Sequence, residues 1–415
     1  MKLIAIVSGA VILQIANGVL GVLVPLEMGL MDQSTAVIGM VVTAYALGFL
    51  TGSAFTVSFV RPVGHIRAFA ALAAVLSVAT ILFTTSESPL LWAALRFVTG
   101  ACLAGIFSVI ESWIAGAAKQ GGLGRTLAVY MICNKTALMA GQGLLSVWHT
   151  DSIALFLLVC ACFSLSLVPV ALTRTDPRLS FDDEKLGFRA LYKIAPIGVV
   201  GCIGSGLING SVQGLFPVYG LGIGLSATII PMFLISTHLG SLACQWPLGW
   251  LSDRIDRRLV IVGASFVSAL ASLAMVFTNE DATYVLLGLF ALSGAFSLSV
   301  YPICVAHASD FTSPSQLVAL IASLLFSWSI GSVIGPPIAT AVMYVSGPGG
   351  LLIYAATVAF SVGVFAAWRM TRRAPVPVED RDAFINVPAT SAVIAAMSAE
   401  VQRSDGDREA NEREA

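Results

Sequence analysis

The sequence contains twelve long apolar stretches, and most of its charged residues lie between them. A backbone that crosses lipid has to satisfy its own hydrogen-bonding groups, so each stretch must form a helix or a strand of a closed barrel. The stretches are longer than the roughly ten residues of a barrel strand and lack its polar alternation. We therefore predict an all-α integral membrane protein with twelve spanning helices, at residues 3–25, 36–60, 68–85, 90–113, 126–148, 153–172, 194–219, 227–251, 259–277, 284–307, 317–345 and 351–370.

The composition argues against several other classes of protein. Charged residues make up 11% of the 415 residues, whereas about 25% is usual for a soluble domain. A net charge of −1 leaves no basic stripe for nucleic acid. All seven cysteines lie inside apolar stretches, which does not suit a disulfide framework or a zinc site. The sequence also shows no nucleotide-binding loop and no His-Glu-x-x-His motif, so we expect neither an enzyme nor a bound cofactor or metal.

The basic residues predict the orientation in the membrane, because Lys and Arg accumulate in short cytoplasmic loops. Sixteen of the 22 basic residues lie at the start of the chain, in the even-to-odd connections, or at the end of the last stretch and directly after it. They are Lys2, Arg61, Arg67, Lys119, Arg125, Arg174, Arg178, Lys185, Arg189, Lys193, Arg254, Arg257, Arg258, Arg369, Arg372 and Arg373. The opposite connections hold only acids, namely Glu27, Asp32, Glu87, Asp151, Glu280 and Asp281. We predict that both termini are cytoplasmic.

A polar interval divides the stretches into two similar sets of six. We predict a first bundle at 1–172, a cytoplasmic linker at 173–193, a second bundle at 194–370 and a disordered cytoplasmic tail at 371–415, leaving open a short ordered segment at 384–397. An offset of 192 to 194 residues superposes residues of the two halves, pairing Asn17 with Asn209, Gly18 with Gly210, Pro25 with Pro217, Gly48 with Gly240, Gly100 with Gly294 and Gly141 with Gly335. Duplicated halves are expected of transporters in which one half rocks against the other.

The most specific motif is GWLSDRIDRR at 249–258, between the eighth and ninth predicted helices. It resembles the G-x-L-x-D-R-x-G-R-R motif of the major facilitator superfamily, with Asp256 in place of the second glycine. The first 370 residues as a whole are similar to this superfamily, and RFVTGACLAGIFSVIESW at 96–113, QWPLGWLSD at 245–253 and GSVIGPP at 331–337 resemble its YcaD-like bacterial branch. The resemblance implies two pseudo-symmetric six-helix bundles, the major facilitator fold, in a bacterial plasma (inner) membrane.

The same resemblance implies a gate on the cytoplasmic side, because in that family the Asp and Arg of this loop hold neighbouring helix ends together. The equivalent loop of the first half, SFVRPVGHIR at 58–67, has Arg61 where the Asp would stand, and Glu111 is the acid available to replace it. Glu111 as a gating ion pair and Glu111 as a proton-coupling carboxylate both remain open. The candidate gating residues are Arg61, Arg67, Glu111, Arg125, Asp253, Arg254, Arg257 and Arg258.

Polar residues at mid-membrane are candidates for solute binding, since such transporters bind substrate near the midplane. Counting about 1.5 Å per residue from the cytoplasmic ends of the helices brings most of them to a depth of ~14 to ~20 Å. They are Asn17, Arg96, Lys135, Asn209, Gln213 and His238. A charge at mid-bilayer costs at least about 2.5 kcal/mol, and an anionic solute would offset that cost for the two cations. Helix packing or proton coupling for Arg96 and His238, and a hydrogen bond between the two asparagines, remain alternatives.

We predict a secondary active transporter that moves a small polar or amphipathic solute, with an anion favoured by the two cations, by alternating access. We expect it to act as a monomer in the lipid bilayer, with protons as the candidate coupling ion and without nucleic acid as a partner. Two alternatives remain. One is a transporter-shaped receptor or sensor, and the other is a proton-coupled drug efflux pump, although the fifth predicted helix lacks the G-x-x-x-G-P string of drug antiporters.

Overall fold

The computed structural model describes residues 2–117, 123–147, 152–173, 187–279, 282–312 and 316–372, together with 376–377, 381, 384 and 389–390. In these ranges the chain forms thirteen α-helices and no strand. The first half consists of α1 (Lys2–Leu30), α2 (Thr35–Val63), α3 (His65–Leu82), α4 (Pro89–Ala117), α5 (Leu123–Val147) and α6 (Ser152–Ala171). The short α7 (Phe188–Ile194) precedes α8 (Pro196–Gly222), α9 (Ile230–Arg254), α10 (Arg257–Val276), α11 (Thr283–Ser309), α12 (Leu317–Ser346) and α13 (Gly350–Met370).

Each of the twelve predicted stretches corresponds to one long helix, so the prediction of an all-α membrane fold is confirmed. Ten of these helices are long and apolar enough to cross a membrane on length and composition alone. The other two, α5 and α9, carry more polar side chains, including Lys135 in α5 and His238 in α9. The structure adds α7 within the predicted linker, and residues 174–186 of that linker lie outside the described ranges.

Local sequence signals set several helix ends. Ser34 caps α2 by accepting a hydrogen bond from the Val37 amide, and Pro196 occupies the first turn of α8, where its missing amide donor costs nothing. Gly64 separates α2 from α3 with a φ of 87°, a conformation that residues with a Cβ rarely adopt. These residues let the chain reverse direction between consecutive helices within a few residues.

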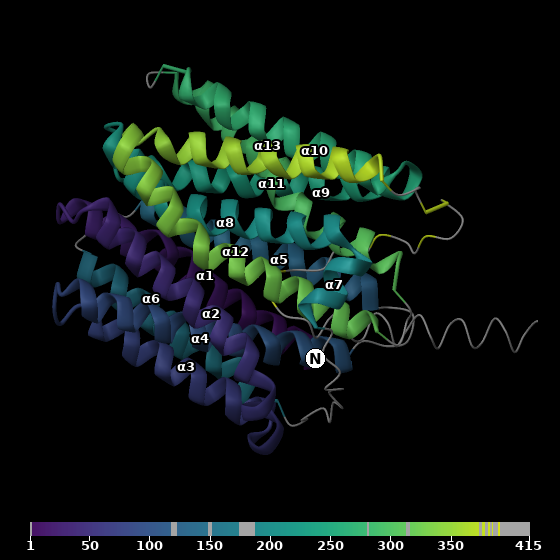
Figure 1. The fold of residues 1–415 in the computed structure, drawn as a ribbon. Helices are drawn as coiled ribbons and strands as arrows, with labels where there is room; N and C mark the ends of the chain where they lie inside the picture. Colours follow the sequence, from purple (N-terminus) through teal and green to yellow (C-terminus); the bar gives the residue numbers. More distant parts are fainter. Residues whose placement is uncertain are drawn as a thin grey trace, which may run out of the picture.

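The helices form two halves that lie side by side (Figure 1). In the first half α1 packs against α5 and α2 against α4, and in the second half α8 packs against α12 and α9 against α11. The halves meet where α2 contacts α12, α5 contacts α9 and α1 contacts α8. We call the end of the bundle with the N-terminus, α7 and the α9–α10 connection the basic end, and the opposite end, with Glu27, Asp32 and Glu87, the acidic end.

Paired glycines bring the helices of each half into backbone contact. A Cβ atom at Gly48 in α2 would meet the carbonyl oxygen of Phe97 in α4, and one at Gly100 in α4 would meet the carbonyl oxygen of Tyr45 in α2. The second half repeats this crossing, with Gly240 in α9 against Ala291 and Gly294 in α11 against Thr237. The same holds for the crossing of α1 with α5 and its counterpart, α8 with α12, which use the pairs Gly18 and Gly141, and Gly210 and Gly335. Small residues permit this close approach in membranes.

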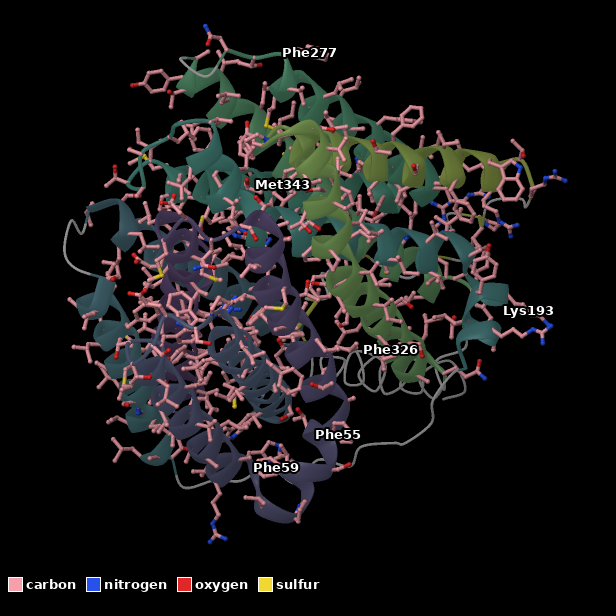
Figure 2. The ribbon with its side chains drawn as sticks, turned by 60° about the vertical axis from the view of Figure 1, so that its left-hand side comes forward. Phe55, Phe59, Lys193, Phe277, Phe326 and Met343 are labelled. Carbon is pink, nitrogen blue, oxygen red and sulfur yellow. The ribbon has the colours of Figure 1, made fainter. Side chains whose placement is uncertain are left out.

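Large apolar side chains project from the surface of the bundle. Phe277 is 81% exposed and Phe55 is 71% exposed, and Figure 2 shows both at the periphery, in contrast to the buried Met343 near the centre of the view. On a soluble protein so many exposed apolar residues would promote aggregation. In lipid they are in contact with acyl chains, which is consistent with a membrane-spanning bundle.

The halves are packed together at the acidic end. Gly39 of α2 lies against Thr340 of α12, and Gly214 of α8 lies against Val42 of α2. The largest cluster of buried apolar side chains runs through the first half and continues at this end into the second half, through residues such as Phe216. The apolar cluster at the basic end instead contains buried residues of the second half only. The structure is therefore closed between its halves at the acidic end.

The glycine crossings predict a selective effect of a single methyl group. Gly240→Ala should destabilise the protein by about 1–3 kcal/mol, because its Cβ meets a backbone carbonyl that cannot move aside cheaply. Gly288→Ala in α11 is the matched control, since nothing lies within 4 Å of its Cβ position. The measurement is the apparent unfolding temperature of each purified variant in the same detergent. Equal unfolding temperatures for the two variants would show that the crossing tolerates a Cβ.

Candidate functional site

Lys135 lies at the contact between the two halves. Its Nζ atom donates hydrogen bonds to Ser241 Oγ and Gln245 Oε1 of α9, each at 2.9 Å. Lys135 is twelve residues from the start of α5, a depth of ~18 Å at a rise of about 1.5 Å per residue. The partners are neutral, and in the described ranges no carboxylate forms an ion pair with Lys135. A partly buried ammonium group is thus held between the halves by hydroxyl and amide oxygens.

His238 lies on the same face of α9 as the partners of Lys135, since residues three and seven positions apart share one side of a helix. The imidazole is buried, and its Nε2 atom has no hydrogen-bond partner among the described residues. Lys135 and His238 are therefore two nitrogen-bearing candidates that the structure places in one region, at the α5–α9 contact.

Arg96 lies elsewhere, inside the first half. Its side chain is 5% exposed and its guanidinium carbon lies 4.3 Å from the ring centroid of Tyr45 in α2. Among the described residues, its Nε and Nη1 atoms have no hydrogen-bond partner. A desolvated cation–π contact contributes about 2 kcal/mol, but it leaves these N–H donors unsatisfied. The guanidinium can therefore donate hydrogen bonds to an anionic group that comes within reach.

The amide candidates bond within their own helices. Asn17 Nδ2 donates to Gln14 Oε1 at 2.8 Å, and Asn209 Nδ2 donates to Ser205 Oγ at 3.1 Å. Asn209 and Gln213 also line a cavity of about 20 Å³ inside the second half, next to Ser272 of α10 and Ser297 of α11. That volume holds about one water molecule. In the described ranges, the six solute-site candidates form no hydrogen bonds with one another.

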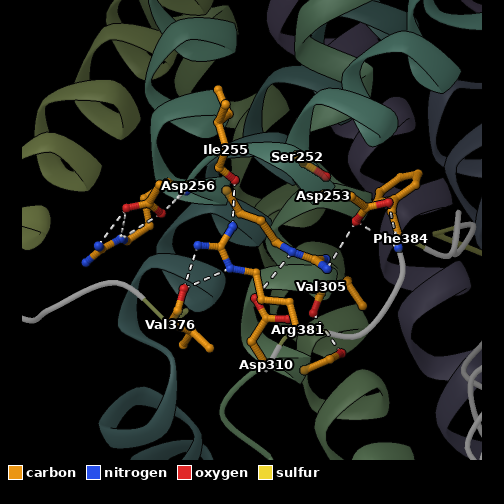
Figure 3. A network of polar contacts seen from close by, with 12 residues as sticks. Ser252, Asp253, Ile255, Asp256, Val305, Asp310, Val376, Arg381 and Phe384 are labelled. Atoms are coloured by element: carbon orange, nitrogen blue, oxygen red, sulfur yellow. Dashed lines mark hydrogen bonds and ion pairs between the residues drawn. The ribbon is translucent and has the colours of Figure 1, made fainter. Parts of the chain in front are cut away.

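Ion pairs at the basic end centre on Arg257, the first residue of α10. Its guanidinium lies 3.3 Å from Asp253 Oδ1, one turn earlier, and 3.3 Å from Asp310 Oδ2 after the end of α11. The side chains of Arg257 and Asp310 are each 2% exposed. Figure 3 shows this network, in which Asp253 and Asp310 lie on either side of one guanidinium. The motif therefore links the ends of α9, α10 and α11.

Asp256, which replaces the second glycine of the family motif, caps α10. Its Oδ1 atom accepts the Arg258 amide at 3.0 Å, and its Oδ2 atom lies 2.7 Å from Arg258 Nη2. Burial raises the pKa of Asp256, but the hydrogen bonds and charge of Arg258 outweigh it and hold that pKa below its usual range. The capping contribution is therefore present at neutral pH and is lost as the pH falls through the lowered pKa.

The other gating candidates occupy varied positions at this end. The Arg254 guanidinium carbon lies 3.9 Å from the ring centroid of Trp250, and Arg67 is exposed. Glu111 is completely buried and accepts a hydrogen bond from Thr390 Oγ1 in the tail. The side chains of Arg61 and Arg125 lie outside the described part of the chain.

Several contributing residues were not among the predicted site residues. Tyr45 stacks on Arg96, Ser241 bonds Lys135, and Asp310 pairs with Arg257. Asp310 carried a usable signal, because it is the one charged residue in the predicted cytoplasmic connection at 308–316, on the side of the membrane where the basic residues gather. Tyr45 and Ser241 carried no signal, since only the rotation of each helix determines which side chains they face.

A sequence model of a protein family and the similar individual sequences both indicate the same family. The sequence model of the Major Facilitator Superfamily matches residues 6–241 and 234–400. The chain is 31% identical over 357 residues to the uncharacterized MFS-type transporter YcaD of Escherichia fergusonii, covering 86% of this chain and 92% of the relative. It is 30% identical over 382 residues to the protein of the same name from Escherichia coli, covering 90% of this chain and 97% of the relative.

Comparison with solved structures shows the same fold. A bacterial homolog of the human lysosomal transporter Spinster, in an inward-facing and occupied conformation, matches with a TM-score of 0.70 at 14% identity, covering 92% of this chain and 97% of that one. The nucleoside transporter NupG matches with a TM-score of 0.75 at 10% identity, covering 90% of this chain and 99% of that one. At these identities the likeness concerns the fold alone.

The ion pairs at the basic end predict different effects for two neighbouring arginines. Arg257→Gln should destabilise the protein by about 3–5 kcal/mol, because it removes a buried cation from the buried Asp310 carboxylate. Arg254→Gln should cost at most about 1 kcal/mol, since Arg254 contributes a stacking contact next to an exposed tryptophan. Thermal unfolding in detergent measures both. A loss for Arg254→Gln as large as that for Arg257→Gln would contradict the central role of Arg257.

Proposed function

This chain belongs to the major facilitator superfamily, and we propose that it moves a small anionic solute, polar or amphipathic, across the membrane by alternating access. Membership of the family makes it a membrane transporter rather than an enzyme, and a multi-pass protein of the inner membrane. The proposal concerns the solute, the residues that bind it, the mechanism and the coupling ion.

The position of Lys135 carries the proposal for the solute. Its ammonium group bonds only neutral oxygens, on Ser241 and Gln245, among the described residues. An isolated charge in the membrane is costly, and such residues commonly mark a substrate or ion pathway. An incoming carboxylate or phosphate would replace these neutral acceptors with a charged one, which adds the attraction between opposite charges to the hydrogen bond. A neutral or cationic solute would leave the cost of placing the Lys135 charge inside the membrane uncompensated.

Arg96 is the proposed second anchor. Its unsatisfied Nε and Nη1 donors can bind an anionic group of the solute once the two halves change their arrangement. Lys135 reaches the opposite half, whereas the Arg96 guanidinium lies over the ring of Tyr45 within its own half. A solute with two polar groups could therefore bridge these cations. Asn17, Asn209 and Gln213 are proposed to contact the polar remainder of the solute.

The close packing of the halves at the acidic end supports alternating access. Gly39, Gly214 and their partners form contacts that have to separate before a solute can enter from that side. We propose that the basic end faces the cytoplasm, in line with the distribution of Lys and Arg, and that both termini lie there. The conformation would then be closed toward the outside, with the ion pairs of Arg257 on the cytoplasmic side.

Protons are the proposed coupling ion, and His238 the proposed carrier. Imidazole changes charge near neutral pH, and a proton on His238 would add positive charge beside Lys135, on the same region of α9. Protonation would favour binding of the anion, so proton and anion would move together.

We assign Glu111 to gating, because its carboxylate accepts a hydrogen bond from Thr390 at the basic end. We further propose that the transporter acts as a monomer.

The first test identifies a solute and then removes the lysine. Purified protein is screened by thermal shift against small carboxylates, phosphorylated metabolites and neutral sugars, because a ligand of the native state raises the unfolding temperature. Radiolabelled uptake of the strongest anionic hit into proteoliposomes should fall at least about tenfold in Lys135→Gln. Lys193→Gln, on the exposed surface of α7, should transport like the parent.

The outcome separates the proposed function from its alternatives. Full uptake by Lys135→Gln would exclude Lys135 from the site, and stabilisation by neutral sugars alone would exclude an anionic solute. Saturable binding of the labelled anion without uptake would favour a receptor or sensor. Uptake that is faster with an inward proton gradient supports proton coupling, and the same uptake with His238→Asn would contradict the role of His238.

A further inference from the structure

Several residues that follow α13 in the tail contact the basic end of the bundle. Its described residues include Arg381, Phe384, Ala389 and Thr390, which we call the tail contacts. Phe384 and Ala389 pack against the apolar cluster of the second half at this end. The remainder of the predicted tail, apart from 371–372 and 376–377, lies outside the described ranges.

The tail contacts bind the family motif on the second half. The Phe384 amide donates to both carboxylate oxygens of Asp253, at 3.0 and 3.2 Å, and its ring lies where a Cβ at Gly249 would stand. Arg381 Nη1 donates to the carbonyl oxygen of Ile255 at 2.6 Å. Figure 3 shows Phe384 beside Asp253, and Arg381 between Ile255 and Val376. The acid and the glycine of the motif therefore have a second use, as a docking surface for the tail.

A further tail residue binds the first half. Thr390 Oγ1 donates a hydrogen bond to Glu111 Oε1 of α4, on a carboxylate that is completely buried. Glu111 is the acid that the sequence offers in place of the missing Asp in the first-half loop. The tail thus contacts the acid of each half, Asp253 in α9 and Glu111 in α4, and its two contact points are six positions apart.

A short stretch of chain joins the two contact points. Six residues span at most about 20 Å when fully extended. A rocking motion that opens the acidic end would bring α4 and α9 together at the basic end and would displace the Phe384 and Thr390 contacts that now join them. Contacts made in only one of two conformations stabilise that conformation by their full free energy.

We propose that the tail is a strap that joins the halves at the basic end and favours the conformation that is closed at the acidic end. This inference rests on the proposed alternating access, and it assigns to the tail the regulation of that cycle. Weakening Phe384 or Thr390 shifts the population toward a conformation with an open acidic end. The strap thereby sets the fraction of molecules in which the solute site is open at the acidic end.

The test reads the conformation directly, without a solute. Thr340→Cys places a thiol at the packed contact with Gly39 at the acidic end, and a membrane-impermeant maleimide reports its accessibility in proteoliposomes of the full-length protein. The chain without Thr340→Cys gives the background of the seven native cysteines. Phe384→Ala and Thr390→Val are compared with Pro377→Ala, an exposed tail residue that serves as the matched control.

Phe384→Ala with Thr390→Val should raise the labelling rate about fivefold, the population shift expected when a net hydrogen bond and a ring contact are lost from one conformation. Pro377→Ala should label at the parent rate. In a Gly249→Ala background, whose Cβ already displaces the ring, Phe384→Ala should add nothing. An unchanged rate in the double variant, or an equal rise in Pro377→Ala, would overturn the strap. Because labelling requires no transport, failure of the solute assay leaves this result interpretable.

Discussion

Close helix crossings at paired glycines are the constraint on which the rest of this structure depends. Lipid is as apolar as the side chains that face it, so helices in a membrane associate by close packing and hydrogen bonding rather than by burial from water. At each crossing one helix backbone reaches the other, as where Gly48 meets Phe97 and Gly240 meets Ala291. The crossings occur in equivalent pairs in the two halves. They fix each half as a rigid body and determine which faces remain for contact between the halves.

The polar chemistry of the protein lies on those remaining faces and at the basic end. The two least apolar long helices, α5 and α9, face each other across the boundary, where Lys135 bonds Ser241 and Gln245. A lysine in this position has a free-energy cost if the bundle is static. If the two halves separate during transport, a solute can replace the partners of Lys135 on α9. The same boundary is closely packed at the acidic end, where Gly39 meets Thr340. Closed packing at one end and exchangeable polar contacts at the middle are compatible with a site that opens to one side at a time.

The sequence predicted the helices because uncharged runs of this length have few alternatives in lipid, and it predicted the pseudo-symmetry because the glycines at the crossings recur at nearly constant offset. The contacts between side chains of different helices were harder to predict. Arg96 and Lys135 share a depth by residue count, yet the structure gives Arg96 a partner on α2 and Lys135 partners on α9. The depth of a residue in the membrane follows from counting along its helix. The side chains that it faces depend on the rotation of the helix about its axis, and a single sequence gives no visible signal for that rotation. The docking of Phe384 on Asp253 was equally hidden, because a single aromatic residue in an acidic tail carries no periodic signal.

The central claim is that two rigid halves expose one site alternately to the two sides of the membrane. Double electron–electron resonance on the protein in lipid, with native cysteines replaced by alanine, measures it through two pairs of spin labels. One pair, at Ser34 and Ser226, spans the acidic end, and the other, at Phe55 and Phe326, spans the basic end. The account predicts two populations in which one distance lengthens as the other shortens, with their ratio changed by solute or pH. Distances that stay fixed under all conditions, or that change in the same direction, would contradict it.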